Sequence, residues 1–378
     1  MSNANLTLMF FLQAAAVLLA CRAAGSLARR LRQPEAVGHM IAGIALGPSL
    51  LGASLPDVQS WLFPTGSRPL LHVVAQVGLV LYMFLVGVEF RLDLFRLKAR
   101  AAGAIAAAGM IVPLLVGMGI AAWLHGTEPR QFGEGVSRLQ AMVFLGAAMS
   151  ITAFPMMARM IAERGLSTSA VGTLLLAAGA IDDVLAWCVL ALLPALVGSG
   201  AAAGWWPAAF AFGGGAAFVA VVAVIRPLMK RLHPPAEPGA LVLPSPALTA
   251  VLTMLALAAW CTDLVGVHSV FGAFVVGAAV PRGWLSEGLL RTLTPVVTAL
   301  LLPFYFVSSG LSTRVTLIDS WWMWVVAAVI VVGACAGKLL ACAAAARLSG
   351  EGGRESLAIG AMMNARGLME LMVLNIGL

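Results

Sequence analysis

Two adjacent acidic residues lie in the middle of an apolar run, where they could bind and release a proton or a cation. Asp182 and Asp183 stand in AGAIDDVLAW, and no other charge occurs from Ala170 to Val197. One Asp at the centre of a bilayer costs about 2.5–3.5 kcal/mol on insertion scales, so two of them require compensation. Consecutive helical residues point about 100° apart, so the two carboxylates should face different neighbours. Lys338, in GACAGKLLACA, lies within another apolar run and is the natural counter-ion for one of them.

A carboxylate held in a low-dielectric medium can alternate between a proton and a metal cation. Burial and a neighbouring like charge both disfavour its ionised form, so it can hold a proton near neutral pH. A dehydrated monovalent cation needs hard oxygen ligands, stabilises the ionised form and expels the proton. The acidic pair therefore predicts competition between H⁺ and Na⁺ or K⁺, and antiport if the site opens to one side of the membrane at a time. A salt bridge needed only for packing is the structural alternative.

Two further apolar segments contain residues that interrupt a helix. The first, FLGAAMSITAFPMMARM from Phe144 to Met160, holds Pro155, which removes a backbone donor, while Ser150 and Thr152 can bind the freed carbonyl groups. In lipid a broken helix is tolerated only where it is buried in protein or lines a cavity. The break would offer oxygen ligands and half-helix dipoles to an ion; a plain proline kink is the alternative.

The second interrupted segment is AMMNARGLMELMVLN, from Ala361 to Asn375, with four residues in mid-span that suit a lipid-facing helix poorly. They are Asn364, Arg366, Gly367 and Glu370. Arg366 and Glu370 are four residues apart and are expected to form a structural ion pair along one helix face.

The elements that position these residues are membrane-spanning helices. The chain of 378 residues is 61% hydrophobic and 10% charged, with a mean hydropathy of +0.98, which excludes a set of soluble domains. A helical span needs about 20 apolar residues. We predict an all-α polytopic membrane protein with twelve spans, near residues 6–28, 36–53, 70–90, 99–124, 139–160, 167–193, 205–229, 246–265, 267–281 (short or broken), 289–311, 320–346 and 355–377.

The basic residues follow a membrane topology. The net charge is +7, and 17 of the 23 Lys and Arg residues lie around loops that follow odd-numbered spans. By the positive-inside rule those loops are cytoplasmic and the N-terminus lies outside. The charge thus gives no support for nucleic-acid binding. The five cysteines have no CxxC spacing, so we expect no cofactor, and no metal besides the transported cation.

Two stretches of the chain resemble each other, and so do the segments that follow them. GHMIAGIALGP (38–48) matches GVHSVFGAFVVGAAVP (266–281), and YMFLVGVE from Tyr82 matches FYFVSSGLS from Phe304. The first pair is seven spans apart, and an odd offset reverses orientation. We therefore predict inverted repeats at 1–198 and 236–378, the second incomplete, with 199–235 as a linker span and the substrate site at the midplane. Similar composition of Gly-rich membrane helices is the alternative explanation.

Taken together, these motifs resemble the second family of monovalent cation:proton antiporters, which includes Kef-type potassium/proton systems, bacterial sodium/proton antiporters and plant cation/proton exchangers. The resemblance covers nearly the whole chain. It rests on QPEAVGHMIAGIALGPSLLG, FLVGVEF, SITAFPMMAR, AIDDVLAW, GVHSVFGAFVVGAAVP, AGKLLA and NARGLMELMVLNIGL.

The resemblance implies a thirteen-span fold of core and dimerisation domains, in which two unwound helices cross. It implies that Asp183 carries the cation and the proton and that Asp182 pairs with Lys338 when no cation is bound. The expected cation and proton site comprises Asp183, Asp182, Thr152, Ser150 and Asn364, with Pro155 and Gly367 at the helix breaks. The resemblance also implies a homodimer in the bacterial inner membrane. The family continues into a thirteenth span after the position of Leu378, and we expect this span to be missing here.

The sequence also allows functions other than cation/proton exchange. Kef-type members typically have Gln before the carrier Asp, so Asp182 disfavours a regulated K⁺ efflux system, which is the first alternative. A transport-incompetent, truncated membrane protein, or a scaffold or sensor, is the second. An enzyme is not expected: an intramembrane aspartyl protease needs acids on two helices, whereas Asp182 and Asp183 are neighbours on one.

Overall fold

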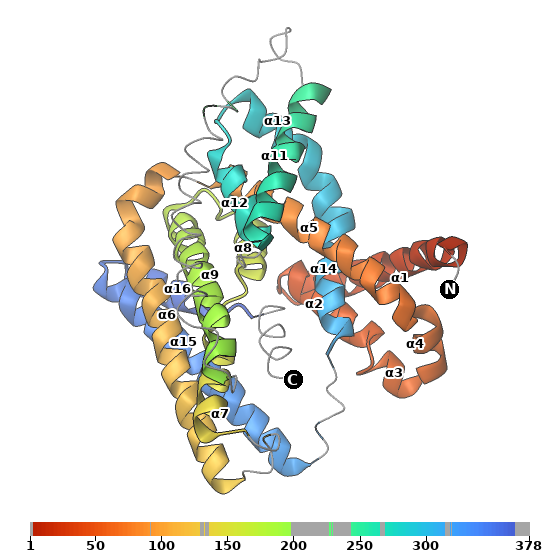
Figure 1. Ribbon diagram of the computed structural model, residues 1–378. Helices are drawn as coiled ribbons and strands as arrows, with labels where there is room; N and C mark the ends of the chain where they lie inside the picture. The colour runs from red at the N-terminus through yellow and green to blue at the C-terminus, as the bar shows by residue number, and fades with distance from the viewer. Residues whose placement is uncertain are drawn as a thin grey trace. The chain divides into compact units, whose positions relative to one another are not determined.

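The computed structural model describes residues 3–90, 92–128, 132, 136–197, 227, 229, 243–264, 269–313, 318 and 320–366, and this part of the chain is helical apart from its turns (Figure 1). Eight helical segments in it are long and apolar enough to cross a membrane. The predicted all-α polytopic membrane fold is therefore confirmed. The number of twelve spans stays a prediction, because the seventh, 205–229, lies outside the described residues except for 227 and 229.

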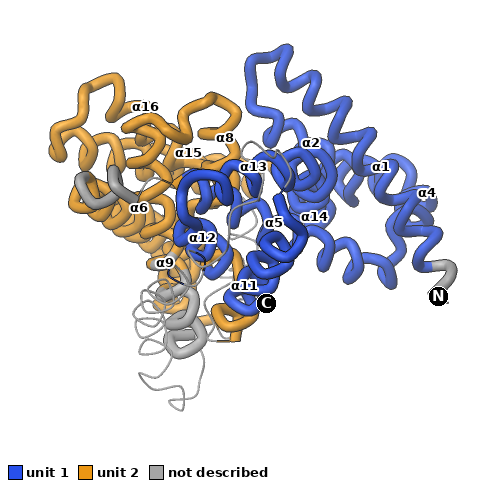
Figure 2. The backbone as a smooth tube through the Cα atoms, turned by 90° about the horizontal axis from the view of Figure 1, so that it is seen from above, with its two compact units in different colours: residues 1–89, 224–259, 272–319 blue, residues 90–223, 260–271, 320–378 orange. Residues whose placement is uncertain are grey.

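The chain divides into two compact units, and each unit draws on both halves of the sequence (Figure 2). Unit 1 comprises residues 1–89, 224–259 and 272–319, and unit 2 comprises residues 90–223, 260–271 and 320–378.

Unit 1 contains helices from the N-terminal and the central parts of the chain. They are α1 (Asn3–Arg30), α2 (Glu35–Leu46), α3 (Leu51–Ser54), α4 (Pro56–Leu62), the 3₁₀ turn η1 (Thr65–Ser67), α5 (Arg68–Glu89), most of α11 (Ser245–Leu264) and α12 (Ser269–Ala279), α13 (Trp284–Val296), the π-helical turn η4 (Val297–Leu301) and α14 (Leu302–Leu311). Helix α2 packs against α1 and α14, and α5 packs against α13 and α14.

Unit 1 has two close helix crossings made by glycines. Gly43 of α2 meets Gly310 of α14, and Gly87 of α5 meets Gly277 of α12. A Cβ atom on any of these four glycines would overlap backbone atoms of the facing helix. The helices can approach this closely only because no side chain intervenes.

Two predicted spans of unit 1 are less regular than expected. The span 36–53 is α2 followed by the short α3, because Gly47 and Pro48 interrupt the helical ladder between them. The span 289–311 is α13, η4 and α14 in succession. Pro303 has no N–H to donate to the preceding turn, and the backbone widens into the π-helical turn that ends at Leu301, two residues before it. The short ninth span, 267–281, is the eleven-residue helix α12.

Unit 2 contains the helices that carry the acidic pair and the interrupted segments. They are α6 (Leu92–Thr127), α7 (Arg138–Ser150), α8 (Phe154–Glu163), α9 (Ala170–Val197), α15 (Trp321–Leu348) and α16 (Gly353–Met363). Helix α6 packs against α7, α9 and α15, and α16 packs against α15 and α9 (Figure 1).

Candidate functional site

The segment predicted to break at Pro155 is interrupted just before it. Helix α7 ends at Ser150, residues 151–153 are not helical, and α8 begins at Phe154 with Pro155 in its first turn. Proline is tolerated in a first turn because the N–H that it lacks has no partner there in any case. Residues 151–153 are buried, so their backbone groups need partners within the protein.

One backbone group and one side chain of this stretch find their partners in the second interrupted segment. Helix α16 ends at Met363, and residues 364–366 are not helical. The Ala153 N–H donates to the Ala365 carbonyl at 2.9 Å, and the Thr152 hydroxyl donates to the Met363 carbonyl at 3.4 Å. The two unwound stretches, which are more than 200 residues apart in sequence, therefore meet within unit 2.

Two cationic side chains bind the carbonyl end of α7. The Lys338 ammonium of α15 donates to the Ser150 carbonyl, and the Arg366 guanidinium donates to the Met149 carbonyl at 3.2 Å. The last carbonyl groups of a helix lack intrahelical partners and carry its partial negative charge. Both cations are therefore placed where they satisfy these groups and offset the helix dipole.

Lys338 also contacts the first residue of the acidic pair. Its Nζ atom lies 3.4 Å from Asp182 Oδ2, and both side chains are 0% exposed. Breaking such a buried pair by removing one charge typically costs about 3–5 kcal/mol, because the other charge is left buried without compensation. The distance is long for an ion pair, so the ammonium is shared between Asp182 and the end of α7.

Several oxygen atoms of the site retain acceptor capacity. Within the described part of the chain, Asp182 Oδ1 and Asn364 Oδ1 are buried and accept no hydrogen bond. The amide of Asn364 donates to the Cys335 carbonyl at 3.3 Å, which fixes the side chain beside α15. Asp183 follows Asp182 on α9 and is 2% exposed. Carboxylate, amide and carbonyl oxygens are the ligands that alkali cations require.

A glycine of α6 leaves room for the Lys338 side chain, and apolar side chains surround the non-helical stretch 151–153. Gly109 of α6 lies beside Lys338 and Cys342, and a Cβ atom at this position would lie 2.5 Å from the Cys342 sulfur. Ile151, in the break itself, packs in a buried cluster with Met110 of α6 and Ala186 of α9.

The structure places most of the residues that the sequence suggested for the site in one unit, and printed contacts join Lys338 to Asp182 and to Ser150. Unit 2 holds Asp182, Asp183, Lys338, Ser150, Thr152, Pro155, Asn364 and Arg366. The Ser150 hydroxyl donates to Ala147 of its own helix at 2.8 Å, so this residue meets Lys338 through its carbonyl group. Gly367 and Glu370 lie outside the described residues, so the expected pairing of Arg366 with Glu370 stays a prediction.

Sequence reasoning missed the contact of Arg366 with Met149 and the contribution of the Cys335 carbonyl. A backbone carbonyl has no sequence signature, so neither acceptor could be named in advance. One signal was available: a cation in mid-span, on the counterpart of a broken helix, is expected near a free carbonyl end.

Comparison with known proteins gives related chains over the whole sequence. Cation/H(+) antiporter 20 of Arabidopsis thaliana is 37% identical over 376 residues, 98% of this chain but 44% of the relative, so the chain spans less than half of that protein. Na(+)/H(+) antiporter NhaS4 of Synechocystis is 32% identical over 100% of this chain and 91% of the relative.

A solved structure shares the fold. The sodium proton antiporter MjNhaP1 of Methanocaldococcus jannaschii superimposes with a TM-score of 0.68 at 13% identity, over 95% of this chain and 81% of that chain. The transmembrane sodium/hydrogen exchanger family matches residues 15–378. Nearly the whole sequence therefore fits one family, and the chain belongs to the sodium/hydrogen exchangers, a family of multi-pass membrane proteins.

Proposed function

We propose that this protein is a secondary active transporter, not an enzyme, that exchanges Na⁺ or K⁺ for H⁺ at Asp183. The observation that carries the proposal is the buried set of Asp182, Asp183 and Lys338 in the unit where the non-helical stretches 151–153 and 364–366 meet. The relatives support the proposal, because their names are those of a cation/proton antiporter and a sodium/proton antiporter.

The exchange follows from competition for one carboxylate. With no cation bound, Asp183 holds a proton and Asp182 contacts Lys338, as the 3.4 Å distance supports. A dehydrated cation that enters stabilises ionised Asp183, and the proton leaves to the side to which the site is open. Asp182, Asn364, Thr152 and the Ser150 carbonyl would supply the remaining oxygen ligands. Alternating access then carries the cation in one direction and the proton in the other.

The two glycine crossings of unit 1 support the proposed inverted repeats. In the sequence match, Gly43 aligns with Gly272 and Gly87 with Gly310. The match therefore pairs α2 with α12, and α5 with α14. In the structure, α2 of the first half contacts α14 of the second half. Its counterpart α12 of the second half contacts α5 of the first half. This reciprocal exchange is what two repeats related by a two-fold axis would produce, and the offset of seven spans would give them opposite orientations. An inner-membrane location, an outside N-terminus and a homodimer complete the proposal.

Everted membrane vesicles test the assigned carrier. They are prepared from bacteria that lack their own antiporters and that express this chain, and respiration acidifies their interior. Addition of NaCl or KCl should partly dissipate the pH gradient in the parent. Asp183→Asn should abolish this response, because an amide cannot bind or release a proton at this pH. Asp57→Asn, which changes an exposed Asp of α4, is the matched control and should transport like the parent. Equal transport by Asp183→Asn would refute the assignment.

The same assay separates sodium from potassium. One relative is Na(+)/H(+) antiporter NhaS4, and another, K(+)/H(+) antiporter 1 of Saccharomyces cerevisiae, is 30% identical. Both cations are dehydrated and bound by oxygen, so the site chemistry favours neither. A response to KCl alone would favour the regulated K⁺ efflux alternative, and a response to NaCl would exclude it.

A further inference from the structure

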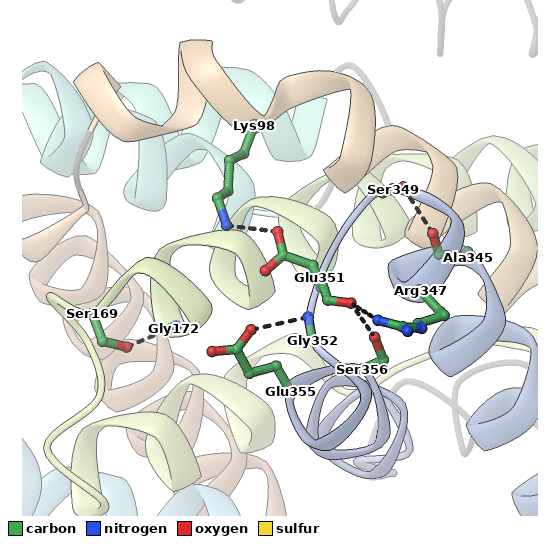
Figure 3. Close-up of polar contacts among 10 residues, drawn as sticks. All are labelled: Lys98, Ser169, Gly172, Ala345, Arg347, Ser349, Glu351, Gly352, Glu355 and Ser356. Carbon is green, nitrogen blue, oxygen red and sulfur yellow. Dashed lines mark hydrogen bonds and ion pairs between the residues drawn. The ribbon is translucent and has the colours of Figure 1, made fainter.

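An ion pair ties the turn between α15 and α16 to α6 (Figure 3). Lys98 Nζ of α6 lies 2.6 Å from Glu351 Oε1 in this turn. The two residues are 253 positions apart in sequence. The Glu351 side chain is only 12% exposed and that of Lys98 is 34% exposed, so water and salt screen the pair less than an ordinary surface pair.

The backbone of Glu351 is fixed independently of its side chain. Its carbonyl accepts hydrogen bonds from the Arg347 guanidinium at 3.1 Å and from the Ser356 hydroxyl at 3.4 Å (Figure 3). Its N–H donates to the Ala346 carbonyl at 3.1 Å. Gly350 precedes it at φ +94°, a left-handed conformation that suits glycine. These hydrogen bonds fix the backbone of the turn, so the Glu351 carboxylate starts from a fixed position when it contacts Lys98 of α6.

Helix α16 transmits the position of this turn to the site. It starts at Gly353, after Gly352 donates its N–H to Glu355 at 3.2 Å, and runs for eleven residues to Met363. At about 1.5 Å per residue it spans roughly 16 Å. It packs tightly on α15, because a Cβ atom on Gly360 would overlap the Leu339 carbonyl. A shift at its start is thus passed on to Asn364, directly after its end.

One face of helix α6 contacts both the turn that contains Glu351 and the buried side chain of Lys338. Lys98 and Gly109 are eleven residues apart, which is about three turns, so they point in nearly the same direction. Lys98 holds the turn through Glu351, and Gly109 lies beside Lys338. The same helix face therefore sets the position of the turn and of the buried ammonium.

We propose that Lys98 and Glu351 form a positioning pair, which holds helix α16 in place relative to α6, so that Asn364 and the Ala365 carbonyl keep their places where residues 151–153 and 364–366 meet. This inference rests on the proposed function. Neither residue contacts the transported ion, and each acts through α16. Loss of the pair should weaken cation binding, while the carrier carboxylate and its proton chemistry stay intact.

The test compares Glu351→Gln, Lys98→Met and the exchanged pair Lys98→Glu/Glu351→Lys with the parent. In everted vesicles each single variant should raise the apparent KM for the cation by about fivefold, at the low end of typical coupling between sites. The exchanged pair should recover most of the parent KM. Glu35→Gln, which breaks the 2.6 Å pair with Arg29 in unit 1, is the matched control and should leave KM unchanged. Unchanged KM in both single variants, or no recovery in the exchanged pair, would overturn the proposal.

Hydrogen exchange of the purified proteins gives a second readout that does not need transport. Amides of α16 and of residues 364–366 should exchange faster in Glu351→Gln than in the parent, and at the parent rate in Glu35→Gln. Equal protection of α16 in Glu351→Gln and the parent would contradict the positioning role. A parent that fails to transport would instead count against the proposed function, and this measurement would still decide the role of the pair.

Discussion

At the scale of single residues, the site depends on charges that only other parts of the protein can stabilise. Lys338 is fully buried and serves two partners, Asp182 and the carbonyl end of α7. Arg366 supports the same helix end through Met149. Lys338 is thus not the counter-ion of Asp182 alone, because the carbonyl end of α7 shares its positive charge.

Removal of the Lys338 charge should destabilise the protein strongly. We expect Lys338→Met to lower the free energy of unfolding by about 3–5 kcal/mol, because Asp182 and the end of α7 lose their cation while remaining buried. Thermal unfolding in detergent measures the loss. Lys338→Met combined with Asp182→Asn should recover part of it, since no uncompensated charge is left. A double variant no more stable than Lys338→Met would show that the pair carries no coupling energy.

Most of these residues could be predicted from the sequence, since charge and proline inside an apolar run are conspicuous. The acidic pair, Lys338 and the residues around Pro155 were all found in this way. The contacts of Arg366 with Met149 and of Lys98 with Glu351 could not be found. The Arg366 contact could not be found because its acceptor is a backbone carbonyl group. The Lys98–Glu351 contact could not be found because both residues lie at the charged ends of spans, where charges are common and no spacing marks a pair.

At the scale of elements, the helices are positioned by small residues as much as by apolar ones. Gly117 of α6 faces Gly146 of α7, and a Cβ atom on Gly117 would lie 2.7 Å from the Gly146 Cα atom. Helix α7 ends in the carbonyl groups that Lys338 and Arg366 bind, so the α6–α7 contact sets where that end lies.

Gly117→Ala should therefore destabilise the protein, whereas Gly119→Ala should not. Overpacking of a tight contact typically costs about 1–3 kcal/mol. A Cβ atom on Gly119, two residues further along the same helix, meets no atom within 4 Å. Replacement of a helical Gly by Ala at such an open position gains about 0.5–1 kcal/mol. Thermal unfolding of the two variants compares them directly, and an equal effect of both would contradict the close α6–α7 contact.

The sequence predicted the main helices better than their interruptions. Apolar length alone located α1, α5, α11 and α15 closely. The π-helical turn before Pro303 and the division of the second span into α2 and α3 were not foreseen, because a proline or glycine in a membrane helix is equally compatible with a mild kink. Helix α6 begins at Leu92, earlier than the predicted 99, since its polar first turns extend beyond the apolar stretch.

At the scale of the whole molecule, the distribution of charge predicts which loops face the cytoplasm. The turn of Gly350 follows an odd-numbered predicted span, and the turn of Thr65 follows an even-numbered one; both residues are exposed. Cysteines placed at the two positions should therefore be reached from opposite sides of the membrane.

Thiol labelling of intact cells tests this topology. In a background with the exposed Cys261 changed to Ser, an impermeant maleimide should label Thr65→Cys in intact cells. Gly350→Cys should be labelled only after the membrane is opened. The reverse pattern would contradict the outside N-terminus and would place the Lys98–Glu351 pair on the outer face.

The central claim, that a proton and a cation compete for one buried carboxylate, is tested most directly by the pH dependence of the apparent KM for the cation. If Asp183 binds one or the other, KM should rise by up to about tenfold for each unit by which the pH falls through the range where the acid is protonated, because one proton must be displaced per cation. The maximal rate at saturating cation should change much less. A KM that stays constant across that pH range in a transporting protein would show that the two ions do not share a site, and would contradict this account.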